Sequence, residues 1–143
     1  MAAMRRPCPR GGFVRWPLVL LLPWLLAACA SDAQPTVTRL QIKDVREGDG
    51  ALASPGRLVV VHYTGEFLDG REFDSSRPRG EPFEFRLGSE DVIAGWNEGI
   101  KGMRVGGVRE LTIPAGMAYG ARGRGEIPPD TPLFFEVELI DVR

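Results

Sequence analysis

The chain has 143 residues, which suffices for one domain with a single hydrophobic core and leaves no room for a second. Its first 15 residues contain four arginines, Arg5, Arg6, Arg10 and Arg15, and no acidic residue. The rest of the chain carries 14 basic against 19 acidic residues, a net charge of −5, and this balance argues against nucleic acid as a partner.

Residues 1–28 have the organisation of a secretory signal. The positive segment is followed by an apolar run, "WPLVLLLPWLLAA" (16–28), which is too short to span a bilayer as a mature helix. The run leads into "LLAAC" (25–29), which resembles the bacterial lipobox. We therefore expect a lipoprotein signal peptide over 1–28, cleavage before Cys29, and lipidation of Cys29 with fatty acyl chains such as palmitate. The alternative is an ordinary cleavable signal beside an incidental cysteine.

Residues 29–35 then form a short lipidated tether, small and polar, that ends at Pro35. Cys8 leaves with the signal and Cys29 carries lipid, so the mature domain has no disulfide and packing alone must stabilise it. Ala30 and Ser31 lack the aspartate associated with inner-membrane retention in enteric bacteria. We therefore expect the protein in the bacterial cell envelope, anchored in the outer membrane and facing the periplasm.

From Thr36 onward, alternation of apolar and polar residues predicts the strands of an antiparallel sheet. Turn signals separate these stretches, among them the Asp-Gly dipeptide within residues 68–71, which is favoured in tight hairpins. The predicted strands cover residues 36–43, 57–65, 83–87, 108–114 and 133–142.

One stretch, "SEDVIAGWNEGI" (89–100), has helical rather than alternating spacing. Ser89 is the expected N-cap, and acidic residues follow it in the first turn. Gly95 and Gly99 each weaken such a helix by roughly 1 kcal/mol relative to alanine, so its stability must come from packing on the sheet. One helix on an antiparallel sheet predicts the α+β class.

The residues that suggest hydrolysis or metal binding lack partners. His62 is the only histidine, and its alternation with Tyr63 predicts that it points to the face of the sheet opposite the helix. We therefore expect His62 to face away from Ser75 and Ser76, which leaves those serines without a base. Neither a second histidine nor a free cysteine is available as a ligand, so no metal or other cofactor is expected.

The glycine-rich run "YGARGRGE" (119–126) fits a phosphate-binding loop poorly, because it leads into "IPP" rather than a helix. A solvated loop is the expectation for its arginine pair. Phe73, Asp74 and Tyr119 fall where turns are expected. Because a small domain with one helix cannot bury every aromatic ring, some of these rings are expected to line a groove.

Six linked motifs follow one another along the chain: "VVHYTG…DG..FDSS" (60–76), "PFEFRLG" (82–88), "VIAGWNEG" (92–99), "LTIP" (111–114), "AYG" (118–120) and "IPP…LFFEVEL" (127–139). Together they resemble the FKBP-type immunophilin peptidyl-prolyl cis-trans isomerases. The resemblance extends over residues 36–143, with its core motifs in 56–143, in the order and nearly the spacing of the family. It implies a curved antiparallel sheet wrapped around one short helix, with a proline-accepting hollow between them.

The resemblance also implies the residues of the site. Tyr63, Phe73, Asp74, Trp96 and Tyr119 would be the catalytic residues, with Trp96 as the floor. The walls that bind substrate would be Phe83, Val92, Ile93, Ile127 and Phe135, and the Ile93 backbone N–H would supply a polar contact. The loop from Tyr119 to Ile127 would overhang the hollow, and it is one residue shorter than in the familiar eukaryotic members.

The implied function is cis-trans isomerisation of X-Pro bonds in exported polypeptides during folding, by a monomer without a cofactor. The family also binds macrolide immunosuppressants in this hollow. Two alternatives stay open: a non-catalytic peptide-binding or chaperone lipoprotein of the envelope, and a structural lipoprotein that merely uses the fold. Asp74, Trp96 and Tyr119 together favour the enzyme, because a scaffold would need only packing residues.

Overall fold

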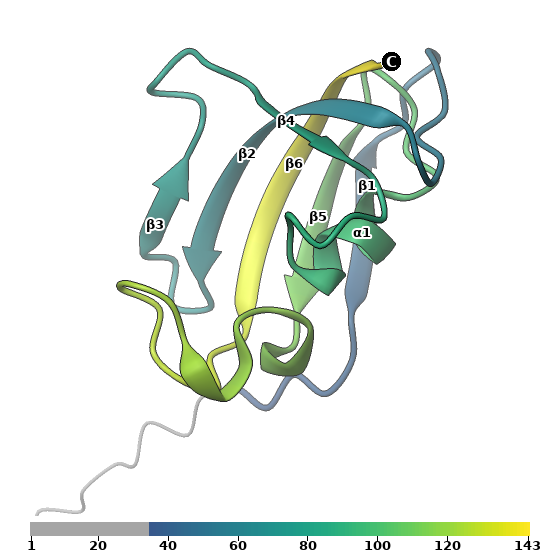
Figure 1. The fold of residues 1–143 in the computed structure, drawn as a ribbon. Coiled ribbons are helices and arrows are strands. Elements are labelled where there is room, and N and C mark those ends of the chain that lie inside the picture. Colours follow the sequence, from purple (N-terminus) through teal and green to yellow (C-terminus); the bar gives the residue numbers. More distant parts are fainter. Residues whose placement is uncertain (1–34) are drawn as a thin grey trace, which may run out of the picture. The chain divides into compact units, whose positions relative to one another are not determined.

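The computed structural model describes residues 35–143, so the signal peptide, Cys29 and tether residues 29–34 lie outside the described residues. The described part forms one antiparallel sheet whose main strands lie in the order β1-β5-β6-β2-β3, while β4 pairs with β2 (Figure 1). Its elements are β1 (Gln41–Arg46), β2 (Leu58–Phe67), β3 (Glu72–Ser75), β4 (Phe83–Arg86), α1 (Ala94–Ile100), β5 (Val108–Ile113), the short 3₁₀ helices η1 (Ala115–Met117) and η2 (Gly120–Arg122), and β6 (Leu133–Val142).

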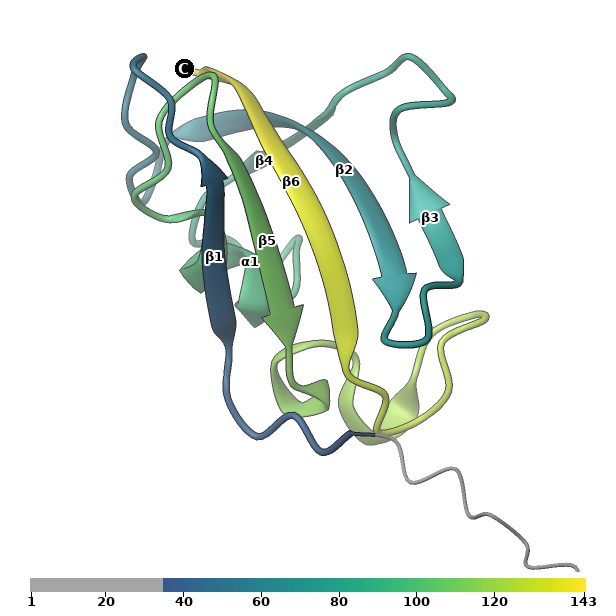
Figure 2. The same ribbon diagram turned by 180° about the vertical axis from the view of Figure 1, so that it is seen from behind.

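The sheet curves around α1, which covers one face of it, and the view from behind shows the other face (Figure 2). This arrangement confirms the predicted α+β fold. β2 and β6 pair along most of their length, and their inward residues alternate with residues of the outer face. No helix within residues 35–143 is long and apolar enough to cross a membrane.

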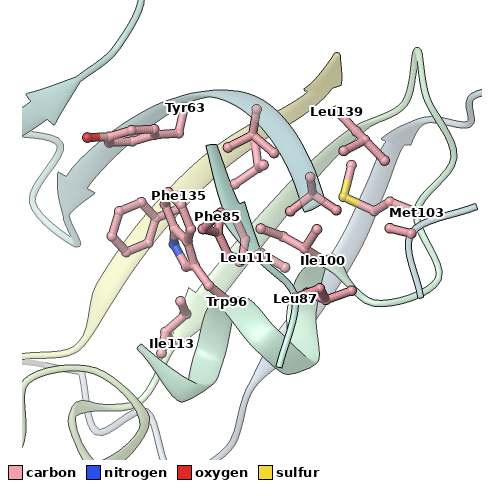
Figure 3. Packing of buried hydrophobic residues seen from close by; sticks show 14 of the residues in the cluster. Tyr63, Phe85, Leu87, Trp96, Ile100, Met103, Leu111, Ile113, Phe135 and Leu139 are labelled. Carbon is pink, nitrogen blue, oxygen red and sulfur yellow. The ribbon is translucent and has the colours of Figure 1, made fainter. Parts of the chain in front are cut away.

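The core lies between the concave face of the sheet and α1 (Figure 3). Residues 35–143 contain no cysteine, so burial of apolar side chains holds the domain together. Ile100 of α1 is completely buried, as are Leu111 and Ile113 of β5. Other large side chains buried to the same degree are Leu87, Leu133 and Leu139.

Two glycines let α1 approach β5 closely. A Cβ atom on Gly95 would lie 2.4 Å from Ile113 Cγ2, and one on Gly99 would lie 2.6 Å from Leu111 Cδ1. The residues that weaken the isolated helix are therefore the ones that allow it to pack on the sheet.

The predicted start of the helix was wrong. α1 begins at Ala94 with Ile93 as its N-cap residue, and no acidic residue lies in its first turn. Ser89 instead accepts a hydrogen bond on its Oγ from the Asp91 N–H at 3.3 Å, within a turn. Ile93 has extended backbone angles, φ −62° and ψ 149°, which a helical residue cannot adopt.

The strand predictions were correct to within two residues at each end for β2, β4, β5 and β6, and two corrections concern the others. β1 begins at Gln41 rather than Thr36, where its pairing with Thr112 of β5 starts. Phe73 and Asp74 lie in β3 and not in a turn. The Asp-Gly turn after β2, with Gly70 at φ 86°, returns the chain so that Asp74 pairs with Gly65.

Candidate active site

The concave side of the sheet holds a hollow of about 1230 Å³. It lies between the inner face of the sheet, the start of α1, the segment 88–93 and the loop 118–127. All ten side chains that the sequence suggested for catalysis or substrate binding line it, although they come from six separate stretches of the chain. They are Tyr63, Phe73, Asp74, Phe83, Val92, Ile93, Trp96, Tyr119, Ile127 and Phe135.

Trp96 forms the floor of this hollow. It stands on α1, is only 5% exposed, and meets Tyr63 and Phe135 edge-to-face at centroid distances of 5.0 Å and 5.4 Å. Figure 3 shows these three rings converging from the helix and from the neighbouring strands β2 and β6. Edge-to-face packing is a favoured arrangement of aromatic rings, so the neighbouring rings help to hold the indole as an aromatic floor.

Phe73 and Phe135 meet edge-to-face at 5.6 Å, and Gly65 makes room for them. A Cβ atom on Gly65 would lie 2.7 Å from Phe135 Cε1 and 2.7 Å from Phe73 Cζ. This glycine of β2 was not singled out from the sequence, because its role depends on rings brought to it by β3 and β6.

Three hydrogen-bonded polar side chains, those of Tyr63, Asp74 and Arg79, form one edge of the hollow. The Tyr63 hydroxyl donates to Asp74 Oδ2 at 2.5 Å, and the Arg79 guanidinium donates to Asp74 Oδ1 at 2.8 Å. Arg79 also donates to the Tyr63 oxygen at 3.3 Å. Sequence reasoning missed Arg79, although an arginine five residues after Asp74 in a turn-rich segment was an available signal.

These contacts fix the charge states of the group. Burial alone would raise the pKa of Asp74, but the hydrogen bonds from Arg79 and Tyr63 outweigh it and lower that pKa below its ordinary value. Burial, helped by the hydrogen bond to Asp74, raises the pKa of Tyr63 above its ordinary value. Asp74 is therefore a carboxylate and Tyr63 a neutral phenol throughout the neutral range.

Two hydrogen-bond donors border the floor on other sides. The Ile93 backbone N–H has no partner among the described residues and lies at the junction of segment 88–93 with α1. Tyr119 stands at the start of η2. A ligand in the hollow can thus meet an apolar floor and polar groups at its edges.

Comparison with known proteins identifies the family. Residues 50–140 match the model of the FKBP-type peptidyl-prolyl cis-trans isomerase family. The chain belongs to this family. It is 52% identical over 106 residues to an FK506-binding protein of Streptomyces anulatus, covering 72% of this chain and 86% of that protein. It is also 52% identical over 104 residues to an FK506-binding protein of Neisseria meningitidis serogroup A. This match covers 72% of this chain and 95% of that protein.

Solved structures agree. The crystal structure of FkpA from Escherichia coli matches with a TM-score of 0.69 and 46% identity, covering 74% of this chain and 49% of that chain. The chain therefore spans about half the length of FkpA. The crystal structure of AtFKBP13 matches with a TM-score of 0.68 and 40% identity. This match covers 73% of this chain and 93% of that chain. The family, fold and enzyme class predicted from the sequence are confirmed.

The loop over the hollow of this FKBP domain exposes Arg122 and Arg124 to solvent, as predicted, and it also contains a closed turn. Arg124 and Ile127 exchange backbone hydrogen bonds at 2.9 Å, which closes a tight turn. The Arg124 guanidinium lies 5.5 Å from the centroid of the Tyr119 ring, within reach of a cation–π contact. Arg124, Gly125 and Glu126 all line the hollow, so this loop contributes charge to its rim.

His62 requires one correction. It lies on the outer face of the FKBP sheet, opposite Glu138 of β6, as alternation predicted. However, it does not face away from the serines, because its Nδ1 lies 3.0 Å from Ser76 Oγ. Ser76 is completely buried, and its Oγ accepts a hydrogen bond from the Tyr63 N–H at 2.9 Å. The pair ties β2 to the chain after β3, out of reach of a substrate in the hollow.

Within residues 35–143, no three His, Cys, Asp or Glu side chains come together in a way that could hold a metal ion.

Proposed function

We propose that the aromatic hollow binds the proline of an X-Pro segment and accelerates rotation about the peptide bond that precedes it. The observation that carries this proposal is the aromatic floor formed by Trp96 between Tyr63 and Phe135. It is bordered by the Asp74 carboxylate with its two donors and by the Ile93 N–H, which has no partner among the described residues. A volume of about 1230 Å³ accommodates a proline ring together with the residues on either side of it.

The reaction needs no nucleophile and no general base. Rotation about the peptide bond disrupts amide resonance, with a barrier of about 18–20 kcal/mol, and at X-Pro bonds the uncatalysed exchange takes tens to hundreds of seconds. No covalent bond forms or breaks, so a catalyst has only to bind the twisted amide better than either planar form. The serines and the histidine outside the hollow are not required.

An apolar hollow favours the twisted amide. Resonance places negative charge on the carbonyl oxygen of the planar amide, so removal of water disfavours the planar forms more than the twisted one. A millionfold acceleration would correspond to about 8 kcal/mol, more than one hydrogen bond contributes. Shape and desolvation must therefore act together with the polar contacts.

Each group then has a role that its position allows. The proline ring packs on the Trp96 indole, and the Ile93 N–H and Tyr119 hydroxyl hold carbonyl oxygens of the substrate. Asp74 does not abstract a proton, because two donors already occupy its oxygens and keep it ionised. It orients Tyr63 and Arg79 at the edge of the hollow.

The same hollow supports a second kind of ligand. Relatives with about half of their residues identical are named FK506-binding proteins. We propose that macrolides of this kind occupy the hollow in place of proline. The physiological substrates we propose are proline-containing segments of exported proteins during folding, handled by a monomeric domain.

The proposed location rests on the sequence. The arginine-rich start, the apolar run and the lipobox-like "LLAAC" support a lipid anchor at Cys29. Ala30 and Ser31 support placement in the outer membrane, facing the periplasm. A domain held there would meet chains that have crossed the inner membrane.

A proline-containing tetrapeptide assay tests the function. The wild type should catalyse cis-to-trans exchange, whereas Tyr119→Ala and Asp74→Val should lose most of this activity while they remain folded by circular dichroism. A wild-type rate equal to the uncatalysed rate would instead favour a module that binds chains without isomerising them.

A further inference from the structure

Asn97, the residue after Trp96 on α1, bonds to both ends of the segment 88–93. Its side-chain Oδ1 accepts a hydrogen bond from the Gly88 N–H at 2.8 Å, and its Nδ2 donates to the Ser89 carbonyl oxygen at 2.8 Å. Its backbone N–H reaches the Ile93 carbonyl oxygen at 3.4 Å. The Asn97 side chain therefore ties the start of this segment to α1, while its end is held by the backbone hydrogen bonds of the first helical turn.

The segment needs such a contact because regular structure does not hold it. It follows β4, and it is neither helix nor strand. Apart from the Asn97 bonds, it is held by a turn bond from the Ser89 N–H to the Arg86 carbonyl oxygen at 3.1 Å, by the local bond from the Asp91 N–H to Ser89 Oγ at 3.3 Å, and by the Trp96 N–H, which donates to the Ile93 carbonyl oxygen at 3.0 Å. Val92 and Ile93 are half-buried and pack on the core, whereas Glu90 and Asp91 are exposed.

The position of this segment matters for the hollow because the segment carries one of the hydrogen-bond donors that border it, the Ile93 N–H. Ile93 lines the hollow, and its N–H has no partner among the described residues. The direction of this N–H depends on the peptide between Val92 and Ile93, which belongs to the segment and precedes the first helical residue. A shift of the segment would move the donor relative to the Trp96 floor.

We propose that Asn97 is a positioning residue for isomerisation, which holds the Ile93 N–H where it can bind a substrate carbonyl. This inference rests on the proposed role of the Ile93 N–H. Asparagine suits the position because one short side chain both donates and accepts, so it satisfies the Gly88 N–H and the Ser89 carbonyl together. Aspartate has nearly the same shape but cannot donate when ionised.

Asn97→Asp is the sharpest test, since it removes the donor with almost no change in packing. We expect KM for a proline tetrapeptide to rise about tenfold with kcat changed less than twofold, because the lost contact would bind planar and twisted amides alike. Asn97→Ala should raise KM at least as much. Glu98→Ala, an exposed neighbour on the same helix with no ion pair in the described part, should leave both constants unchanged.

If Asn97 only stabilised the fold, its variants would show a different pattern of kcat and KM. Loss of folded protein would lower the apparent kcat at constant KM, and it would show as unfolding near the assay temperature. An unchanged KM in Asn97→Asp, or an equal rise of KM in Glu98→Ala, would overturn the proposal.

A second measurement needs no catalysis. In the free protein, ¹⁵N relaxation should give rigid order parameters of about 0.85 for Val92 and Ile93, falling below about 0.6 in Asn97→Asp. Unchanged order parameters would overturn the positioning role of Asn97 even if KM rose. If the wild type itself proves inactive, the proposed function fails, while these order parameters still decide whether Asn97 holds the segment.

Discussion

A Cβ atom on Gly95 would lie 2.4 Å from Ile113 Cγ2, closer than carbon atoms approach without one of them moving. Helix propensity alone predicts that Gly95→Ala stabilises the domain by about 1 kcal/mol. Contact with β5 predicts the opposite, a net loss of about 1–3 kcal/mol from overpacking. Urea unfolding of the variant measures which effect is larger.

Gly116→Ala is the matched control for this prediction. Gly116 lies in η1, and an added Cβ atom would meet nothing within 4 Å. Its free energy of unfolding should change by less than about 0.5 kcal/mol. A stabilised Gly95→Ala variant would show that α1 does not pack on β5 as closely as described.

Gly65→Ala should impair the hollow more than the fold. The new methyl group would push against Phe73 and Phe135, each 2.7 Å from its position, and displace rings that line the hollow. We expect kcat/KM for a proline tetrapeptide to fall at least tenfold, in a variant that still unfolds cooperatively well above the assay temperature. Activity equal to the wild type would mean that these rings do not shape the proline site.

The sequence predicted most of the fold and the ten side chains that line the hollow from its candidate list, but for different reasons. β2 and β6 were predictable because alternation is strong where one face of a strand is buried, as at Val59, Val61, Val137 and Leu139. The hollow was predictable only through linked motifs, since Phe73 and Tyr119 look like ordinary turn or core residues when taken singly.

What escaped prediction depends on contacts between distant segments. Ser89 looked like an N-cap, yet the helix starts at Ala94 and the Ser89 carbonyl oxygen accepts a hydrogen bond from Asn97 Nδ2. The role of Gly65 depends on its contact with Phe135, and that of Arg79 on its hydrogen bond to Asp74. Neither contact is visible in the sequence. His62 was assigned to the correct face, but its bond to Ser76 requires the turn after β3 to bring that serine back to β2.

The catalysed rate should be independent of pH between about pH 5 and about pH 8.5. The folded-state pKa of Asp74 is lowered, so the stability contributed by its carboxylate is present above the unfolded pKa of about 3.9 and is lost as pH falls through the folded pKa. The pKa of Tyr63 is raised, which keeps its hydroxyl protonated over the whole window. Measurement of kcat/KM across this range checks the prediction, and a bell-shaped profile centred near neutrality would indicate an acid and a base that the hollow does not offer.

Cys29→Ser should release the protein from the membrane. Without the thiol, no lipid can be attached, and the domain itself should not hold the protein in the membrane fraction. Fractionation of cells that express the full chain, with Cys8→Ser as the control that keeps its anchor, measures the distribution. A variant at Cys29 that stays in the membrane fraction as fully as the wild type would contradict lipid anchoring at this residue.

The most direct test of the central claim, that the hollow accelerates rotation without moving a proton, is the rate of tetrapeptide isomerisation in H₂O and in D₂O. We predict a catalysed rate far above the spontaneous one in both solvents. The ratio of kcat/KM in H₂O to kcat/KM in D₂O should be close to 1. A catalysed rate indistinguishable from the spontaneous one, or a ratio of about 2 or more, would contradict the claim.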